Sequence, residues 1–180
     1  MKRVKLILFC IIFGLILPDL GFAKTAEEIN ASVNESIKSF YEKVSAAKGL
    51  AEKAEGVLVF PSIIKAGFGI GGEYGEGALR IKGETVDYYS SAAASIGFQI
   101  GAQSKTVILM FMTKKALKEF RDSKGWEVGV DASVALIEVG AGGSLDTTNL
   151  KQPILGFVVG QKGLMYNLTL EGSKMTKLVR

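Results

Sequence analysis

Apolar residues recur along this chain with two different periods. From residue 26 to residue 47 they recur every three or four positions, which is typical of one buried face of an α-helix. This apolar stripe consists of Ile29, Val33, Ile37, Phe40 and Val44. Thr25 and Glu28 have the spacing of a capping box and predict where the helix begins. A second, short helix is expected over residues 50–55.

Beyond residue 56 the apolar residues alternate or form short runs, as in β-strands. Strands are expected in the segments 57–60, 78–82, 85–89, 95–101, 106–112, 126–130, 132–140, 154–159, 164–170 and 175–179. Gly83 and the segments 160–163 and 171–173 are expected to form turns. Such short connections favour antiparallel neighbours, and small residues at alternate positions permit tight curvature.

These patterns predict an α+β fold. Its main part is a mainly antiparallel, glycine-rich β-sheet, either barrel-like or a sandwich. An amphipathic helix precedes the sheet, and a short helix over 114–122 interrupts it. Thr113 is expected to cap that short helix, and Gly125 to follow its end.

The first 23 residues have the pattern of a secretory signal peptide. Lys2, Arg3 and Lys5 give a positive start, an apolar run follows over 6–17, and cleavage is expected before Lys24. The run of 12 residues is shorter than the roughly 18 that a membrane-spanning helix needs. An uncleaved anchor helix is the alternative.

Cleavage would leave a single domain over 24–180, with a helical part at 24–55 and a β body at 56–180. The predicted location is the periplasm or the outside of the cell, with peripheral attachment to a membrane as a further option. Histidine is absent, and the single cysteine, Cys10, lies inside the apolar run. Disulfides, thiolate or imidazole metal sites and Cys or His catalysis are therefore excluded from the mature chain, and no cofactor or metal is predicted. The net charge of +4 is too small to indicate nucleic acid.

A glycine-rich segment at residues 67–72 matches the pattern G-x-G-x-x-G, with Asp87 following at the spacing of a dinucleotide-binding loop. That loop requires a helix after its last glycine. Gly75 and Gly77 follow closely instead, and each would cost a helix about 1 kcal/mol. A glycine-rich strand or bend, closely approached by other backbone, is therefore expected here.

Carboxylates leave a hydrolase open as an alternative. Its candidate residues are Glu73 and Glu76, beside the glycine-rich segment, and Asp131. Glu127 and Asp131 would lie roughly 13 Å apart on one strand. That separation exceeds the roughly 5–9.5 Å of a glycosidase pair, and there is no Gly-x-Ser-x-Gly motif. The sequence favours a non-enzymatic protein.

The short helix at 114–122 carries most of its cations opposite its apolar face. The residues predicted to bind anionic lipid headgroups are Lys114, Lys115, Lys118, Arg121 and Lys124, extended by Lys65 and Lys162 as loop or turn cations. Each Lys or Arg near an anionic membrane is worth about 1 kcal/mol. An ordinary solvated helix face is the alternative interpretation.

Several segments, read together, resemble the SYLF-domain family. They are Val59-Phe60-Pro61, residues 65–77, 101–105 and 110–113, residues 125–135 beginning Gly-Trp-Glu-Val-Gly-Val-Asp, and Gly160-Gln161-Lys162-Gly163-Leu164-Met165. The resemblance covers about 55–175 and implies a lipid-binding module. Its eukaryotic relatives bind phosphoinositides, regulate actin assembly beside membranes and use a basic N-terminal amphipathic helix in membrane contact. The helix at 26–47 of this chain departs from that pattern, with four Glu and two Lys on its polar face.

The leading hypothesis is an exported, non-enzymatic domain that binds anionic phospholipid at a membrane surface. The basic helix would supply charge, and the apolar helix faces would add shallow insertion. The alternatives are a protein–protein interaction module of the cell envelope and a hydrolase that uses Glu73, Glu76 or Asp131. The expected partners are an anionic phospholipid or membrane surface and an envelope protein, with no nucleic acid.

Overall fold

The computed structural model describes residues 24–137, 150–163, 170 and 172–180. Its elements are α2 (Ala26–Lys43), α3 (Ala47–Lys53), β1 (Gly56–Ile81), β2 (Glu84–Phe111), α4 (Lys114–Asp122), β3 (Trp126–Glu127), β4 (Ala135–Ile137), β5 (Ile154–Gly163) and β6 (Lys174–Leu178). The predicted signal peptide, nearly all of the strand expected at 164–170 and the end of that expected at 132–140 lie outside the described residues.

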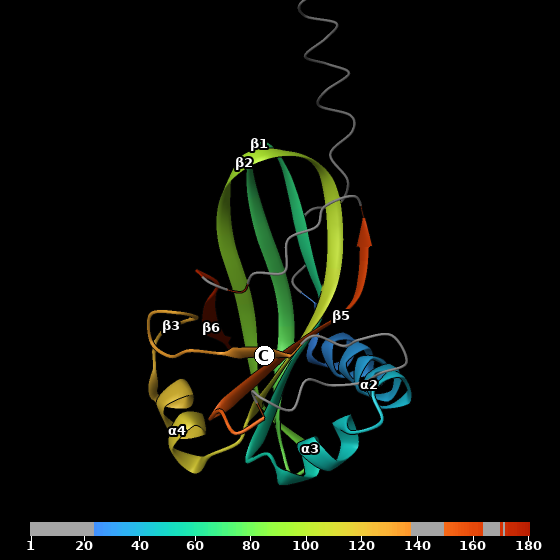
Figure 1. The fold of residues 1–180 in the computed structure, drawn as a ribbon, viewed down its shortest axis with the longest axis vertical. Helices are drawn as coiled ribbons and strands as arrows, with labels where there is room; N and C mark the ends of the chain where they lie inside the picture. The colour runs from blue at the N-terminus through green and yellow to red at the C-terminus, as the bar shows by residue number, and fades with distance from the viewer. Residues whose placement is uncertain (1–23, 138–149, 164–169, 171) are drawn as a thin grey trace, which may run out of the picture.

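The predicted α+β class is confirmed, because the described strands form one sheet with helices packed on it (Figure 1). The strand order is β3-β6-β2-β5-β4, with β1 paired to β2 off this path. Every pair of named strands is antiparallel except β4 with β5, which is parallel. The prediction of mainly antiparallel neighbours therefore holds for this part of the chain.

The first two strands form one long, curved hairpin that arches away from the helices (Figure 1). Lys82 and Gly83 connect them with φ angles of 53° and 87°. Two positive φ angles are the requirement of the two-residue turn whose twist matches that of paired strands. The turn expected at Gly83 is confirmed.

The separate strands expected in this region are continuous segments of β1 and β2. The first strand was expected to end at residue 60, but β1 continues through Pro61. The pairing register shifts between Phe60 and Ile63. Such a bulge accommodates proline, which cannot donate a ladder hydrogen bond. The segment 160–163, expected to be a turn, belongs to β5.

Glycines let β1 fold back closely on itself. A Cβ atom at Gly75 would lie 2.6 Å from the carbonyl oxygen of Ser62, and one at Gly77 would lie 2.1 Å from that of Val59. Since real Cβ atoms do not approach backbone so closely, only glycine fits these two positions. The glycine-rich segment at 67–72 lies in β1, so the expected strand is confirmed and replaces the helix that a dinucleotide-binding loop would need. The close backbone approach occurs just after that segment, at Gly75 and Gly77.

The N-terminal helix begins where its capping box predicts. The Thr25 amide donates to Glu28 Oε2 at 2.7 Å, and the Glu28 amide donates to Thr25 Oγ1 at 3.2 Å. The helix ends at Lys43, four residues earlier than expected, although Val44 remains fully buried. The second helix, α3, begins at Ala47 and not at residue 50.

Buried side chains form two apolar clusters. One joins the apolar stripe of α2 to Val59, Ile108, Leu155 and Phe157 of the sheet. The other joins Leu117 and Phe120 of α4 to β1, β2 and Trp126. The helices α2 and α4 are therefore fixed to the sheet through different cores.

Candidate functional site

The helix α4 presents its cations on a firmly anchored scaffold. Thr113 Oγ1 accepts the amide hydrogen of Ala116 at 3.2 Å, which confirms the predicted cap. The apolar residues of α4 are buried, and Phe120 is only 1% exposed. The ring of Phe120 lies 4.7 Å from that of Tyr89 and 5.4 Å from that of Trp126. The opposite, basic face of the helix is exposed.

A groove of about 400 Å³ runs beside this basic face. It is lined by Lys114, Leu117, Lys118, Arg121, Asp122 and Lys177. Three of its four cations come from α4 and the fourth from β6. We call this surface the α4 groove.

Two of the groove cations are positioned by one buried carboxylate. Asp87 is 8% exposed; its Oδ2 lies 3.0 Å from Arg121 Nε and its Oδ1 lies 2.5 Å from Lys177 Nζ. A buried carboxylate that bridges two cations holds both in a defined place, which freely rotating surface lysines lack. Helix and strand therefore present their charges side by side.

The other groove cations are less constrained. Lys118 pairs with Asp122 one helical turn later, and this hydrogen bond raises the pKa of the Lys118 ammonium. Both side chains are largely exposed, so this pair contributes little to stability. Lys114 forms no ion pair with any other described residue. The groove therefore combines fixed and adaptable cations, an arrangement suited to oxyanions.

Comparison with known families supports the resemblance seen in the sequence. A family model described as "Ysc84: Las17-binding protein actin regulator" matches residues 92–178, which include the whole α4 groove. Residues 92–178 belong to the SYLF family. No curated protein matches the chain. The description of the family is that of a binding and regulatory protein, so the SYLF region is an interaction module at this coarse level.

The remaining predicted cations lie outside the α4 groove. Lys115 is exposed and lies 3.8 Å from Glu119, while Lys124 is exposed beyond the helix end. The prediction that Lys65 is a loop cation is wrong, because Lys65 lies in β1 and is 4% exposed. Lys162 also does not lie in a turn; it lies in β5, where it pairs with Ser104 of β2.

Lys65 is buried because an interior carboxylate balances it. Glu73 Oε1 lies 3.4 Å from Lys65 Nζ, and Glu73 Oε2 lies 2.8 Å from Lys105 Nζ. These contacts cross between the two halves of the folded β1 and its neighbour β2. The pairing could not be predicted from the sequence, because Lys65 and Glu73 meet only where β1 bends between them.

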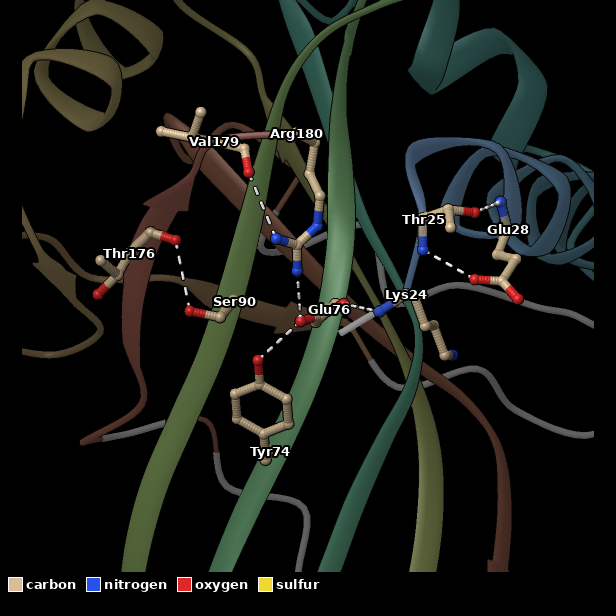
Figure 2. A network of polar contacts seen from close by, with 9 residues as sticks. All are labelled: Lys24, Thr25, Glu28, Tyr74, Glu76, Ser90, Thr176, Val179 and Arg180. Carbon is tan, nitrogen blue, oxygen red and sulfur yellow. Dashed lines mark hydrogen bonds and ion pairs between the residues drawn. The ribbon is translucent and has the colours of Figure 1, made fainter. Parts of the chain in front are cut away.

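The hydrolase candidates each have structural partners. Glu73 forms the two interior ion pairs. Glu76 accepts hydrogen bonds from the Tyr74 hydroxyl at 2.9 Å, from Arg180 at 2.8 Å and from the Lys24 amide at 3.2 Å (Figure 2). Asp131 Oδ2 accepts the Glu127 amide hydrogen at 2.6 Å. Glu73 and Glu76 therefore tie separate chain segments together, and Asp131 stabilises the turn that follows β3.

The apolar faces of the helices are not available for the shallow membrane insertion that we expected. Ile29 and Val33 of α2 and Phe120 of α4 are at most 1% exposed. Insertion would require these helices to leave the sheet and lose their core contacts. In addition, no helix in the described part of the chain has the length and apolar character needed to cross a bilayer.

The sequence did not indicate Lys177 as a groove residue, nor Asp87 as the carboxylate that holds two groove cations. Both lie far along the chain from residues 114–122, and Lys177 reaches the groove because β6 pairs with β2, where Lys177 is opposite Tyr89. A basic residue in a strand carries no signal of a helix beside it. Among the described residues, no group of acidic side chains is arranged to hold a metal ion.

Tyr89, beside Asp87, predicts a loss of stability at alkaline pH. It is 2% exposed, and its hydroxyl has no hydrogen-bond partner. Burial first, and then the charge of Asp87, raise the pKa of Tyr89 to about 12, against the lowering effect of Arg121. The unfolded chain ionises this phenol near pH 10, so stability falls by up to about 2 kcal/mol as the pH rises from about 10 to 12.

Replacing Tyr89 with phenylalanine should remove this contribution. At pH 7 the variant is expected to gain about 1 kcal/mol, because it no longer buries an unpaired hydroxyl. Urea unfolding of both proteins at pH 7 and pH 11 measures the two effects, and the difference between the proteins cancels the other groups that titrate. Equal alkaline losses in both proteins would contradict the assignment to Tyr89.

Proposed function

We propose that this SYLF protein is an exported, non-enzymatic binding protein whose α4 groove docks on the headgroups of anionic phospholipids. The observation that carries the proposal is the convergence of four cations from α4 and β6 on one groove, with two of them held by the buried Asp87. Phosphate oxygens accept charge-assisted hydrogen bonds from such donors, and the planar guanidinium of Arg121 suits them especially well.

Export is the second part of the proposal. It is supported by the signal-peptide pattern of residues 1–23. Lys24, the expected first residue after cleavage, already donates its backbone N–H to Glu76 in the folded domain. An envelope location would give the α4 groove a membrane surface to contact.

Removing the two adaptable groove cations tests the headgroup site. The double variant Lys114→Gln/Lys118→Gln keeps Asp87 paired with Arg121 and Lys177, so its buried carboxylate stays satisfied. At about 1 kcal/mol per cation, its affinity for anionic vesicles should fall roughly 30-fold. Co-sedimentation with vesicles of phosphatidylcholine, with and without phosphatidylglycerol, measures this change.

The matched control is Lys115→Gln/Lys124→Gln, which removes the same charge from the same helix region but not from the groove lining. Its affinity should fall by less than about threefold, because exposed charges outside the site act only through a screened field. Equal losses in both variants, or unchanged binding in the groove variant, would overturn the groove as the site. Binding should also weaken at high salt, since the Debye length falls to about 3 Å at 1 M.

The same vesicle experiment distinguishes phospholipid binding from the main rival hypothesis, a protein–protein interaction module. A protein–protein interaction module would bind its partner without lipid and would retain binding at high salt. Absence of binding to both neutral and anionic vesicles would reject the phospholipid proposal and favour this rival, which the Las17-binding description of the family also supports.

A further inference from the structure

A second pocket, of about 360 Å³, lies between α2, α3 and the turn of the β1–β2 hairpin. It is lined by Ile37, Tyr41, Ala51, Glu52, Ala54, Val57, Arg80, Lys82 and Gly83. None of these residues lines the α4 groove. We call it the Arg80 pocket.

Arg80 is the unusual residue of this pocket. Its Nε atom is buried and has no hydrogen-bond partner, and Arg80 forms no ion pair with any other described residue. Leaving a buried donor unpaired costs about 1–3 kcal/mol, and more for a charged group. Buried polar groups in folded proteins are otherwise almost always paired. An oxyanion at this position would satisfy the Nε–H of Arg80.

The charges around Arg80 favour an anionic ligand group. Lys82 adds a second cation, and Glu52 is the one carboxylate in the lining, which leaves a net charge of +1. Tyr41 lines the same pocket. Burial raises the pKa of Tyr41, Glu52 raises it further and Arg80 lowers it. Glu52 does not pair with Arg80, so the guanidinium keeps donors for a ligand.

The remaining pocket walls are apolar and suit a ligand that also has a hydrocarbon part. Ile37 from α2, Ala51 and Ala54 from the region of α3, and Val57 from β1 contribute only hydrocarbon. Ligand pockets in proteins have volumes of roughly 300–1,000 Å³ and combine apolar walls with a few placed polar groups. The Arg80 pocket has this composition and lies at the lower end of that range.

We propose that the Arg80 pocket binds a single-chain amphiphile with an anionic head. Its carboxylate or phosphate oxygens accept hydrogen bonds from Arg80, and its hydrocarbon chain lies against Ile37, Ala51 and Val57. This site is separate from the α4 groove and does not depend on the phospholipid proposal. It would hold an individual molecule, such as a fatty acid or an alkyl phosphate, and not a membrane surface.

Isothermal titration of the purified protein with decanoate, decyl phosphate, decanol and inorganic phosphate tests the proposal. All amphiphiles are kept below their micelle concentrations. We expect decanoate or decyl phosphate, or both, to bind at least tenfold more tightly than decanol and than inorganic phosphate. Comparing the two anionic amphiphiles identifies the preferred head group. If decanol binds as tightly as the anionic amphiphiles, the role of Arg80 is overturned. If inorganic phosphate binds as tightly as they do, the role of the apolar wall is overturned.

Three variants test whether the amphiphile binds in the Arg80 pocket. Arg80→Gln removes the guanidinium, and Ala51→Phe fills the apolar end; each should weaken binding at least tenfold. Lys43→Gln removes one exposed charge from α2 outside this pocket and should leave the affinity unchanged. Unchanged affinity in Arg80→Gln, or loss in Lys43→Gln equal to that in Arg80→Gln, would overturn the proposal.

NMR titration of the unmodified protein does not depend on the folding of any variant. The Arg80 Nε–H resonance and the amides of α3 should shift on adding decanoate, and the amides of α4 should not. Shifts confined to α4 would overturn the Arg80 pocket. The groove variant Lys114→Gln/Lys118→Gln should bind decanoate as the unmodified protein does, so failure of one site is distinguishable from failure of the other.

Discussion

Replacing Phe120 with alanine is expected to lower the free energy of unfolding by about 3–5 kcal/mol. The side chain is 1% exposed, and its ring lies 4.7 Å from Tyr89, 4.8 Å from Phe111 and 5.4 Å from Trp126. Truncation would remove these three ring contacts and leave a cavity among side chains from different elements. Urea denaturation followed by tryptophan fluorescence measures the loss.

The same substitution should weaken the candidate site. Phe120 is the central anchor of α4, so its loss frees the helix that carries three of the four groove cations. Glu119→Ala is the matched control, because its side chain is 63% exposed and its ion pair with Lys115 is long, at 3.8 Å. That control should change stability by no more than about 0.5 kcal/mol. A loss below about 1 kcal/mol for Phe120→Ala would contradict the anchoring role.

Replacing Gly77 with alanine is expected to cost more than about 3 kcal/mol, above the usual range for overpacking, or to prevent folding. The added Cβ would lie 2.1 Å from the carbonyl oxygen of Val59 and 2.8 Å from Cδ1 of Phe60. The first of these atoms is backbone in a paired strand and cannot rotate away. The two halves of β1 would have to separate, which would disturb the buried core on both sides.

Two other glycines provide controls for Gly77. Gly72→Ala, in the same strand, would meet nothing closer than 3.7 Å and should be tolerated. Gly49→Ala, within α3, would meet nothing within 4 Å and should stabilise the protein by up to about 1 kcal/mol, because alanine favours a helix. Soluble yield and urea midpoints compare the three variants. Similar values for Gly77→Ala and Gly72→Ala would contradict the close approach within β1.

Features that depend on residues close together in the chain could be predicted from the amino-acid sequence. Thr25 and Glu28 form the capping box that their spacing predicts, and α4 has the predicted limits and cap. The hairpin turn at Gly83 was also predictable, because a glycine between two strand patterns favours a positive φ angle. These features are set by hydrogen bonds and apolar periodicities that extend over a few residues.

Which side chains meet in the core and at the candidate sites depends on how the chain folds in three dimensions. The bend in β1 brings Lys65 to Glu73 and buries a cation that the sequence placed at the surface. The pairing of β6 with β2 carries Lys177 to the α4 groove, and the packing of α2 and α3 on the hairpin forms the Arg80 pocket. The last two join segments far apart in the chain, whereas Lys65 and Glu73 belong to the two halves of one bent strand. All of these contacts depend on where the sheet curves and in which register its strands pair, and no local pattern of residues specifies either.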